Sequence, residues 1–453
     1  MKKEIIFFEF IPSCIIVLMP MLLITGPFLS DLGVSIVTIL FLINSKKNNL
    51  LKYYNNIYFK VFIIFWILLI ISSLLSNNVL ISLKNSLFYF RFGIFSLCFW
   101  FLIEKNIKIM NYIFYSIIFC FFSLIIDGYI QFFFGKNIFG IEAHNAQRVS
   151  SFFGSELILG SYLARFFPIL FALFVLINKK LKVKNNKLLF LITIIFILAE
   201  GLILLSGERL ALFFMNLSAI YIILMIRDYR MYRLWTYIGS LTLIFMLLFF
   251  FPVAKNRIID QTINDFTGKS IEDSNFYIFS KSHNDMYISA IRIFFDNKFF
   301  GVGPRQFRNE CKDYVISAYS CETHPHNTYI ELLSEAGIFA FLIVAILFSL
   351  ITFFSFKHFF LRIFNSKKIF FDDFQICRFC FGFITTSTSF KWRCSGNVIT
   401  TITITTRGFP ISILAVSFKV WRNLEISLYE GSFQRGLEVQ SYNAQELRLK
   451  LYY

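Results

Sequence analysis

Blocks of apolar residues recur along the chain as far as about residue 370, and each is long enough to cross a hydrocarbon core of about 30 Å. They predict ten transmembrane helices, at residues 5–25, 29–44, 58–75, 86–103, 110–134, 157–177, 188–205, 210–226, 234–253 and 336–356. Only Gly26-Pro27 separates the first two, and the second is short, which predicts a tight or re-entrant pair. The pattern indicates an all-α polytopic membrane protein, because a β-barrel would show alternating segments of ~10 residues.

Composition agrees with this fold class. The chain is 57% hydrophobic and holds 63 phenylalanines, and only 16% of its residues are charged. The net charge of +17 could suggest nucleic acid, but most lysines lie in short loops and no basic face or recognition motif is present, so we expect no nucleic-acid partner. Met1-Lys-Lys-Glu before an apolar run is similar to a signal sequence. Since no small-x-small cleavage site follows, we expect an anchored first helix instead.

Basic residues fall in alternate loops between the predicted helices. They are Lys46, Lys47 and Lys52; Lys105 and Lys108; Lys179, Lys180, Lys182, Lys184 and Lys187; Arg227, Arg230 and Arg233; and Lys357, Arg362, Lys367 and Lys368. All lie on the side of the Lys2-Lys3 N-terminus, which the positive-inside rule makes cytoplasmic. The loops that then face outward are 26–31, 76–85, 135–156, 206–209 and 254–335.

Four charged residues lie in or beside apolar segments, in the half of the membrane that this orientation makes the outer one: Arg91, Asp127, Arg165 and Glu200. A charge at the centre of a membrane helix costs about 2.5–3.5 kcal/mol on insertion scales. Each could simply pair with a neighbouring helix. Their shared depth favours a polar cavity that opens at the outer leaflet.

The long outer loop contains the most telling polar segment of the chain. It runs through Gly301-Val-Gly-Pro-Arg-Gln-Phe307 and Thr323-His-Pro-His-Asn-Thr-Tyr329 to Glu331-Leu-Leu-Ser-Glu-Ala-Gly337. Gly301-x-Gly303 has neither the preceding strand nor the third glycine of a nucleotide-binding motif, so we expect a tight turn. Cys311 and Cys321 lie ten residues apart on a side predicted to be oxidising, where a disulfide can brace the loop.

His324 and His326 are the candidate catalytic residues. Pro325 biases His324 toward an extended backbone, which keeps both imidazoles ahead of the next helix. A histidine is the usual general base near neutral pH, and the nine residues between Asn327 and Gly337 favour His326 in that role. Two histidines at i and i+2 could instead bind a metal, but no third ligand lies at zinc spacing, so we expect no metal. The remaining alternative is a plain loop histidine at the membrane interface.

Arginines recur beside the outward-facing segments: Arg148, Arg209 next to Glu208, Arg292 and Arg305. The planar guanidinium suits phosphate oxygens because it donates two parallel, charge-assisted hydrogen bonds. Several arginines at one membrane face favour a clamp for a diphosphate group, and we expect Glu208 to bind substrate with them. Arg305 and Arg308 could instead be solvated loop charges, whereas Arg209, at the mouth of two apolar helices, is less easily explained in that way.

From about Phe374 the chain changes character. Lysines outnumber arginines 23 to 12 in residues 1–373, whereas residues 374–453 hold 3 lysines and 6 arginines and are rich in threonine. A soluble β-rich domain or out-of-frame translation would explain this change, and we favour the frameshift because the further helix expected after residue 373 does not arrive. Cys377-x-x-Cys380 with Cys394 lacks a fourth ligand for a zinc site.

Three motifs together resemble the signature region of the O-antigen ligase and O-antigen polymerase family. They are Gly301-Val-Gly-Pro-x-x-Phe307, His324-x-His326-Asn327 and Glu335-x-Gly337-Ile338. Arg148 with Phe-Phe-Gly-Ser-Glu, and Ser206-Gly-Glu-Arg209, are similar to upstream landmarks of the family. The resemblance covers roughly residues 10–370. Ala340 departs from the glycine, threonine or tyrosine that is usual at its position, and the family's C-terminal helices do not follow.

The resemblance implies a glycosyltransferase of the bacterial inner membrane that works without metal or cofactor and has a large periplasmic loop. It would move a glycan from an undecaprenyl diphosphate carrier to an acceptor hydroxyl, on another glycan or on lipid A-core, with inversion at the anomeric carbon. His326 matches the family histidine that activates the acceptor, Arg209 matches an arginine that holds the lipid diphosphate, and Arg292 is a looser match of that kind.

The motif does not separate polymerisation of repeat units from ligation to lipid A-core or transfer to a protein, and we favour polymerisation slightly. A lipid-linked glycan flippase or another polysaccharide transporter is the alternative from a different class. A transporter would spread its charges through both leaflets and show weak internal repeats. In this sequence the charges lie in the predicted outer half, and no repeat is visible.

Overall fold

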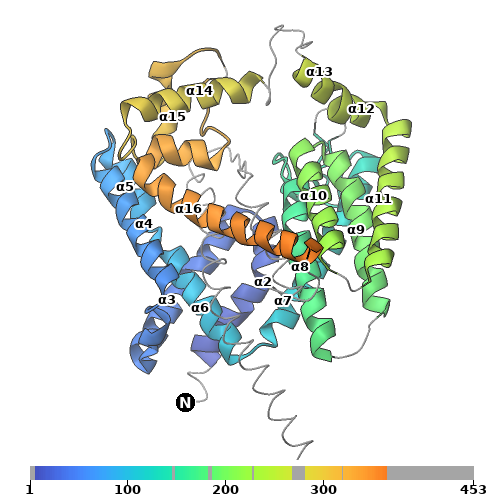
Figure 1. Cartoon of the computed structure of the whole chain (residues 1–453), viewed down its shortest axis with the longest axis horizontal. Helices are drawn as coiled ribbons and strands as arrows, with labels where there is room; N and C mark the ends of the chain where they lie inside the picture. The colour runs from blue at the N-terminus through green and yellow to red at the C-terminus, as the bar shows by residue number, and fades with distance from the viewer. Residues whose placement is uncertain are drawn as a thin grey trace, which may run out of the picture.

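The computed structural model describes residues 6–144, 148–181, 186–226, 229–267, 281–318 and 320–364. Over these residues the regular structure is helical, and the β structure is limited to two isolated bridges, Lys136↔Glu142 and His144↔Arg148. The predicted fold class is therefore confirmed (Figure 1). The segment 374–453, with Cys377, Cys380 and Cys394, lies outside the described residues.

Each of the ten predicted transmembrane segments corresponds to a helix. The membrane helices are α2 (Ile11–Ile24, preceded by the π-helix η1, Ile6–Phe10), α3 (Pro27–Asn48), α4 (Ile57–Leu74), α5 (Val79–Leu87) with α6 (Phe90–Lys105), α7 (Ile109–Phe134), α8 (Leu159–Leu181), α9 (Asn186–Ser206), α10 (Arg209–Met225), α11 (Arg230–Phe250) and α16 (Thr328–Phe364). Nine helical segments in the described part of the chain are long and apolar enough to cross a membrane, and α10 is a shorter apolar helix. The protein is thus a multi-pass membrane protein.

Two details of the prediction need correction. The second segment is not short: α3 has 22 residues and packs against α2 as a full-length antiparallel partner, so it is not a re-entrant segment. The segment 254–335, predicted to be a long outer loop, contains several helices. They are α12 (Pro252–Lys255, from just before the predicted boundary), η4 (Asn256–Asp260), α13 (Gln261–Thr267), α14 (Lys281–Asp296), α15 (Phe307–Glu310) and η5 (Cys311–Tyr314).

The last membrane helix begins earlier than its apolar pattern indicates, at Thr328 rather than 336. Asn327 begins it, because its Oδ1 accepts hydrogen bonds from the backbone N–H of Tyr329 at 3.0 Å and of Ile330 at 3.3 Å. An asparagine in this position satisfies N–H groups that have no partner inside the helix. The first turns of α16 are polar, and hydropathy alone therefore missed them.

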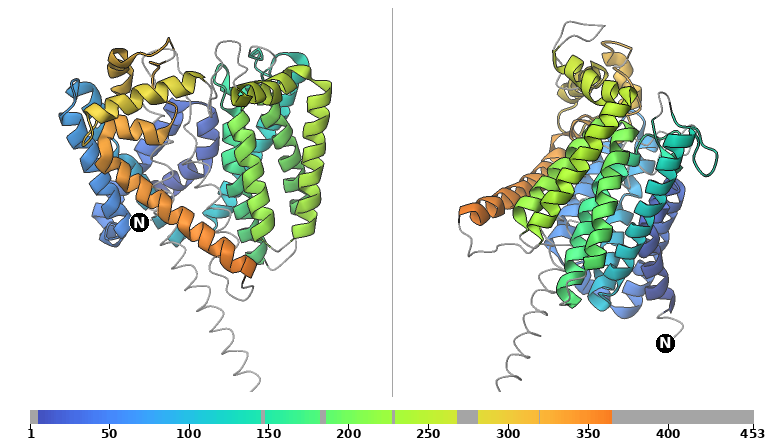
Figure 2. Two further views of the ribbon diagram at one scale, coloured as in Figure 1. Left: turned by 45° about the horizontal axis from the view of Figure 1, so that its top comes forward. Right: turned by 90° about the vertical axis from the view of Figure 1, so that its right-hand side faces the viewer.

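The helices form one bundle in which α2 and α7 lie between two groups (Figure 1). On one side of the view lie α3, α4 and α5 with α14 and α15, and on the other lie α8 to α11, while α16 packs on α4 and α14 and crosses the front. Helices α12, α13 and α14 lie at the end of the bundle opposite the N-terminus (Figure 2). The membrane helices from α7 to α11 alternate in direction, so the last residues of α7, α9 and α11 and the first residues of α8 and α10 lie at this same end.

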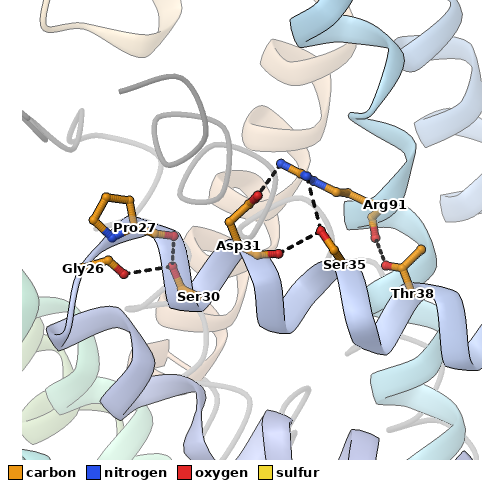
Figure 3. Close-up of polar contacts among 7 residues, drawn as sticks. All are labelled: Gly26, Pro27, Ser30, Asp31, Ser35, Thr38 and Arg91. Carbon is orange, nitrogen blue, oxygen red and sulfur yellow. Dashed lines mark hydrogen bonds and ion pairs between the residues drawn. The ribbon is translucent and has the colours of Figure 1, made fainter. Parts of the chain in front are cut away.

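Three of the four predicted intramembrane charges have partners on other elements, namely Arg91, Asp127 and Arg165. Arg91 of α6 forms an ion pair with Asp31 of α3 at 2.5 Å, and Thr38 Oγ1 donates to the Arg91 carbonyl at 3.0 Å (Figure 3). Asp127 binds the loop after α7, and Arg165 interacts electrostatically with Glu208. These contacts lie with different elements. The arrangement therefore favours structural pairing over the shared cavity that their depth suggested.

Candidate functional site

The loop that carries Arg148 is held by two buried polar side chains in the last turns of α7. Asp127 accepts hydrogen bonds from Ser151 Oγ at 2.6 Å, from Ile138 N at 2.9 Å and from Asn137 Nδ2 at 3.3 Å. Gln131 Oε1 accepts from the backbone of Ser150 and Ser151. Buried polar groups of this kind are costly unless they are paired, so these contacts fix the loop against the end of α7. Asp127 thus positions Arg148.

Arginine side chains gather around the turn between α9 and α10. Helix α9 ends at Ser206 because Gly207 takes φ +70°, and its N–H donates to Leu204 O at 2.9 Å. Glycine suits this left-handed position because it has no Cβ. The next residue, Glu208, begins α10, but its carboxylate turns to the neighbouring helix. It accepts from Gly160 N at 2.6 Å, Ser161 N at 3.0 Å and Ser161 Oγ at 2.5 Å.

Glu208 therefore caps the N-terminus of α8, where a carboxylate is stabilised by the unpaired N–H groups and the helix dipole. Burial raises the pKa of the Glu208 carboxyl, while its hydrogen bonds with Ser161 and Gly160 and the charge of Arg148 lower it. This contact joins α8 to the α9–α10 turn. The Glu208 carboxylate is thus part of the scaffold beside Arg209, and its predicted role in substrate binding stays a prediction.

Three arginines gather around this turn, and we call Arg148, Arg209 and Arg257 the arginine site. Arg148 Nε donates to Ser206 O at 2.9 Å, and Arg257 Nε makes a long hydrogen bond to Gly207 O at 3.4 Å. Arg209 Nη1 donates to Thr262 Oγ1 of α13 at 3.2 Å. Arg257 was not among the predicted residues. Arg257 lies in the segment after α11, far from Arg148 in the sequence, and no recognisable motif surrounds it.

These arginines affect one another's charge. Burial and then the charge of Arg257 lower the pKa of Arg148, Glu208 raises it, and the net result is a pKa of about 10. Burial also lowers the pKa of Arg257, and the charge of Arg209 adds to that effect. Like charges placed side by side in a half-buried position destabilise each other. The arrangement is therefore suited to a negatively charged ligand.

The Gly-x-Gly motif is a docking turn against a break in α16. The break is at Gly337, with φ +74° and ψ −176°, and the carbonyls just before it accept hydrogen bonds from outside the helix. Val302 N donates to Ser334 O at 3.0 Å, and Gly303 N donates to Glu335 O at 2.8 Å. A side chain at Gly301 would collide with the backbone of Glu335. The expected tight turn is thus confirmed, and its function is packing.

The same motif also binds α4 and α5. Ser72 Oγ of α4 donates to Glu335 O at 2.9 Å, and fully buried Gln306 donates through Nε2 to Ser82 Oγ of α5 at 3.0 Å. A methyl group on Gly303 would lie 2.6 Å from Ser76. Glycine is needed here because two backbone segments and a helix meet without space for a side chain. The polar island is therefore fixed to the membrane bundle.

The second group of candidate residues, His283, Glu322, His324 and His326, we call the histidine site. His324 and His326 are buried, and their ring centroids lie 4.2 Å apart. His326 Nε2 lies 3.0 Å from Glu322 Oε2. His283 of α14 approaches His326 from another element, with 5.5 Å between the ring centroids.

His326 has a positive φ of 55°, so the tight bend at Pro325 and His326 turns the two rings together. Backbone strain of this kind is enriched at functional sites. The sequence had indicated His324 and His326, and the structure brings both to one place. Neither His283 nor Glu322 was predicted. An i, i+4 carboxylate before a histidine is a usable sequence signal for Glu322, whereas His283 becomes visible only when α14 folds over the loop.

A disulfide joins Cys311 and Cys321, as the sequence had suggested. Cys311 is fully buried among Ala290, Ile293, Val302 and Phe307, which form a small core under α14. The bridge closes the loop that leads into the histidine site one residue before Glu322. It therefore limits the freedom of that loop.

The other two predicted arginines belong to other elements, the Gly-x-Gly motif and α14. Burial and then the charge of Arg308 lower the pKa of Arg305, Glu335 raises it, and the net result is a pKa of about 10. Arg305 thus belongs to the Gly-x-Gly motif. Arg292 is on the exposed face of α14. In the part of the chain that the structure describes, no group of three or more histidine, cysteine or acidic side chains is arranged to hold a metal ion.

The fold and these two sites define a class: a multi-pass membrane protein with a buried histidine group and an arginine group at the same end of its bundle. Residues 192–345, from within α9 to within α16, match the model of the O-Antigen ligase family. This match supports the resemblance to the O-antigen ligase and polymerase family that the motifs had indicated. No curated protein matches it.

The family match supports a role in O-antigen or surface-polysaccharide assembly, in general terms that of a glycosyltransferase-like enzyme that acts on lipid-linked glycans. The matched segment includes Arg209, Arg257 and both histidines of the loop, whereas Arg148 lies outside it.

Proposed function

We propose that this protein transfers a glycan from undecaprenyl diphosphate to a sugar hydroxyl, at the periplasmic face of the bacterial inner membrane. The acceptor is a second glycan or lipid A-core. The observation that carries the proposal is the contact of buried His326 with Glu322 at the end of the bundle that also holds the arginine site. These two sites together supply a base and a positive charge.

His326 is the general base of this reaction. When its Nε2 proton is directed at the Glu322 carboxylate, Nδ1 is the acceptor nitrogen of the neutral ring. The carboxylate also stabilises the imidazolium that forms when the ring takes a proton, as the acidic residue of a catalytic triad does. His324, with its ring against His326, holds that ring in place from the other side.

The chemical step is a direct displacement. The acceptor O–H gives its proton to His326 while its oxygen forms a bond to the anomeric carbon of the donor sugar. The bond from that carbon to the diphosphate oxygen breaks, and the electron pair stays on the lipid diphosphate. Attack from the face opposite the leaving group inverts the anomeric carbon. Arginines placed in advance near the diphosphate stabilise its growing charge.

The side of the membrane follows from the basic loops. The ends of the bundle differ, because Lys46, Lys47, Lys105 and Lys108 lie with the N-terminus. Both sites lie at the other end. The positive-inside rule assigns the basic end to the cytoplasm, so the proposal places both sites in the periplasm, where lipid-linked glycans are used.

The test replaces one residue in each site of the full chain. His326→Ala and Arg209→Ala, each expressed in a strain that lacks the gene, should reduce glycan transfer at least about 100-fold, the range that a general base contributes. His144→Ala is the matched control, since His144 is an exposed histidine of the loop before Arg148. Immunoblots of membranes check that all variants insert equally. Wild-type transfer by either site variant removes that residue from the mechanism.

The glycan profile of the deletion strain separates the reactions within the family. Lipid A-core with a single repeat unit indicates a polymerase, which we favour, and carrier-linked polymer indicates a ligase. If complete lipid-linked units instead stay on the cytoplasmic side, the protein is a flippase and the proposed transfer is wrong.

A further inference from the structure

The loop after α7 bends back along the helix that precedes it. Asp127 lies seven residues before Phe134, the last residue of α7, which places it about 10 Å from that end of the helix. Its Oδ1 nevertheless accepts a hydrogen bond from the backbone N–H of Ile138 at 2.9 Å, and Gln131 Nε2 donates to the carbonyl of Ile141 at 3.2 Å. The loop therefore descends beside α7, and in the right-hand view of Figure 2 it projects from the side of the bundle.

The tip of this loop reaches the level of the hydrocarbon core. Helix α7 has 26 residues and is therefore about 39 Å long, whereas a hydrocarbon core is about 30 Å thick. A centred helix of this length extends about 5 Å beyond the core at each end, so Asp127 lies about 6 Å inside it. Ile138 is bonded to Asp127 and lies at the same depth.

Every backbone N–H group from Asn137 to Ile141 has a partner within the protein. The Asn137 side chain accepts from the N–H of Phe139 at 3.0 Å and of Ile141 at 2.8 Å. The Asn137 carbonyl accepts from Gly140 N, and Asn137 N donates to Ile141 O, both at 2.9 Å. The remaining N–H, that of Ile138, donates to α7. Lipid offers no water to pair with a backbone group, so a loop that enters it needs this complete pairing.

The side chains at the tip are apolar and exposed. Ile138 is 60% exposed and Phe139 is 76% exposed, and the adjoining Phe133 and Phe134 of α7 are exposed as well. Phe133 continues an exposed stripe of α7 whose members lie seven residues apart: Tyr112, Phe119 and Ile126. Lipid covers this stripe in a membrane helix. The apolar tip thus adjoins a surface that already faces lipid.

The charged residues of the loop lie at its neck instead of its tip. Lys136 Nζ forms an ion pair with Glu142 Oε1 at 3.1 Å, and both side chains are exposed. Ala143 N donates to Gly135 O at 2.9 Å, so the neck is level with the end of α7. Charged residues next to an apolar tip match the headgroup layer and the acyl chains beneath it. A surface for a water-soluble partner would lie beyond the end of α7.

We propose that Ile138 and Phe139 insert into the lipid leaflet beside α7 and anchor the loop that leads to Arg148. The partner of this surface is the acyl chains of membrane lipid. Asp127 connects the anchor to the rest of the loop, because it also accepts a hydrogen bond from Ser151 Oγ. This inference goes beyond the proposed function and does not depend on it, since it concerns the depth of a loop and no step of the reaction.

The test compares the accessibility of single introduced thiols. Full-chain Phe139→Cys protein, one copy in each nanodisc of phosphatidylethanolamine and phosphatidylglycerol, is labelled with a charged maleimide. Labelling of the unsubstituted protein is subtracted, because the chain has eight cysteines of its own. His144→Cys is the matched control, since His144 is an exposed residue of the same loop beyond the neck. Phe139→Cys should react at least about tenfold more slowly, because an apolar environment suppresses the thiolate.

Equal labelling rates for the two variants would overturn the inference, because the structure leaves the Phe139 side chain exposed and the nanodisc holds no other protein to cover it. A second measurement keeps an aromatic ring at the tip. The photoreactive residue p-benzoylphenylalanine is introduced at position 139 in cells and irradiated. An adduct with phospholipid is the expected result. An adduct with a protein would make the tip a protein-binding surface and contradict lipid insertion.

Discussion

The histidine site comes from residues 283–326, whereas the arginine site draws on three separate segments around Arg148, Arg209 and Arg257. The first is braced by the Cys311–Cys321 disulfide and by backbone hydrogen bonds between the Gly-x-Gly turn and α16. The second depends on buried side chains of α7 and on two long-range arginine contacts with the carbonyls of one turn.

Because of this difference, we expect the two sites to respond differently to substitutions and to the loss of ligand. The histidine site is stabilised by the protein itself, and we expect it to keep its geometry without ligand. The arginine site contains like charges whose repulsion an anion relieves, and we expect its order to depend on the bound diphosphate. The following variants test whether the two sites can be disturbed one at a time.

Gly337→Ala should have the largest effect, and it should act on the histidine site. The backbone of Gly337 has φ +74° and ψ −176°, which residues with a Cβ rarely adopt, and the added methyl would collide with the carbonyl of Phe299. We expect a loss of about 3 kcal/mol or more in stability and no detectable transfer. Thermal unfolding in detergent measures the first and glycan profiles the second.

Gly239→Ala is the control for that variant, because a methyl at Gly239 of α11 meets only Ile197 Cδ1, at 3.7 Å. Gly337→Ala protein should still bind farnesyl diphosphate, which serves as a probe for the lipid diphosphate, because the arginine site lies on other helices. Such binding would show that the histidine site can be disturbed without the arginine site. Equal stability of the two glycine variants would contradict the docking role of Gly337.

Asp127→Ala should act on the arginine site. It removes the acceptor of three hydrogen bonds that hold the loop of Arg148, and each unpaired buried donor costs about 1–3 kcal/mol. We expect diphosphate binding to weaken roughly tenfold in protein that still folds. Modification of His326 by diethyl pyrocarbonate, read by mass spectrometry, should keep its wild-type rate.

Glu142→Ala is its control, because Glu142 is an exposed carboxylate of the same loop. If Asp127→Ala changes the reactivity of His326 as much as it changes diphosphate binding, the two sites are coupled and the comparison drawn here fails.

Cys311→Ser should have an intermediate effect, confined to the histidine site. A disulfide that closes a short loop contributes about 2–4 kcal/mol, so the unfolding temperature should fall while transfer persists at a reduced rate. Cys321→Ser should match it, and the double variant should add little, because either change removes the same bond. Cys14→Ser, at a free cysteine of α2, is the control. Additive losses would show that the two thiols contribute separately.

Arg292→Ala should have the smallest effect. Arg292 is exposed on α14, whereas Arg148 and Arg257 contact the α9–α10 turn, and the family resemblance makes Arg292 a loose match for a diphosphate-binding arginine. We expect a loss of transfer of about twofold, the scale of an exposed charge. A loss as large as that of Arg209→Ala would place Arg292 in the donor site.

Much of the molecule was predictable where the signal is local. Ten apolar segments predicted the membrane helices because a lipid environment requires long apolar stretches. His324, His326 and the cysteine pair could be found because they lie within one loop of the chain. The start of α16 could not be found in the same way, since Asn327 determines it and the polar turn after Asn327 hides it from hydropathy.

The sequence by itself determined the class of the protein, its membrane helices and the family that its motifs indicate, because apolar length and short motifs are properties of neighbouring residues. Tertiary structure alone decided that Glu208 caps α8, that Glu322 and His283 approach His326, and that Arg257 joins Arg148 on the carbonyls of one turn. Most of these contacts join residues that are distant in the sequence, and the contact of Glu322 with His326 depends on the backbone bend at Pro325 and His326. Helix packing brings the distant residues into contact.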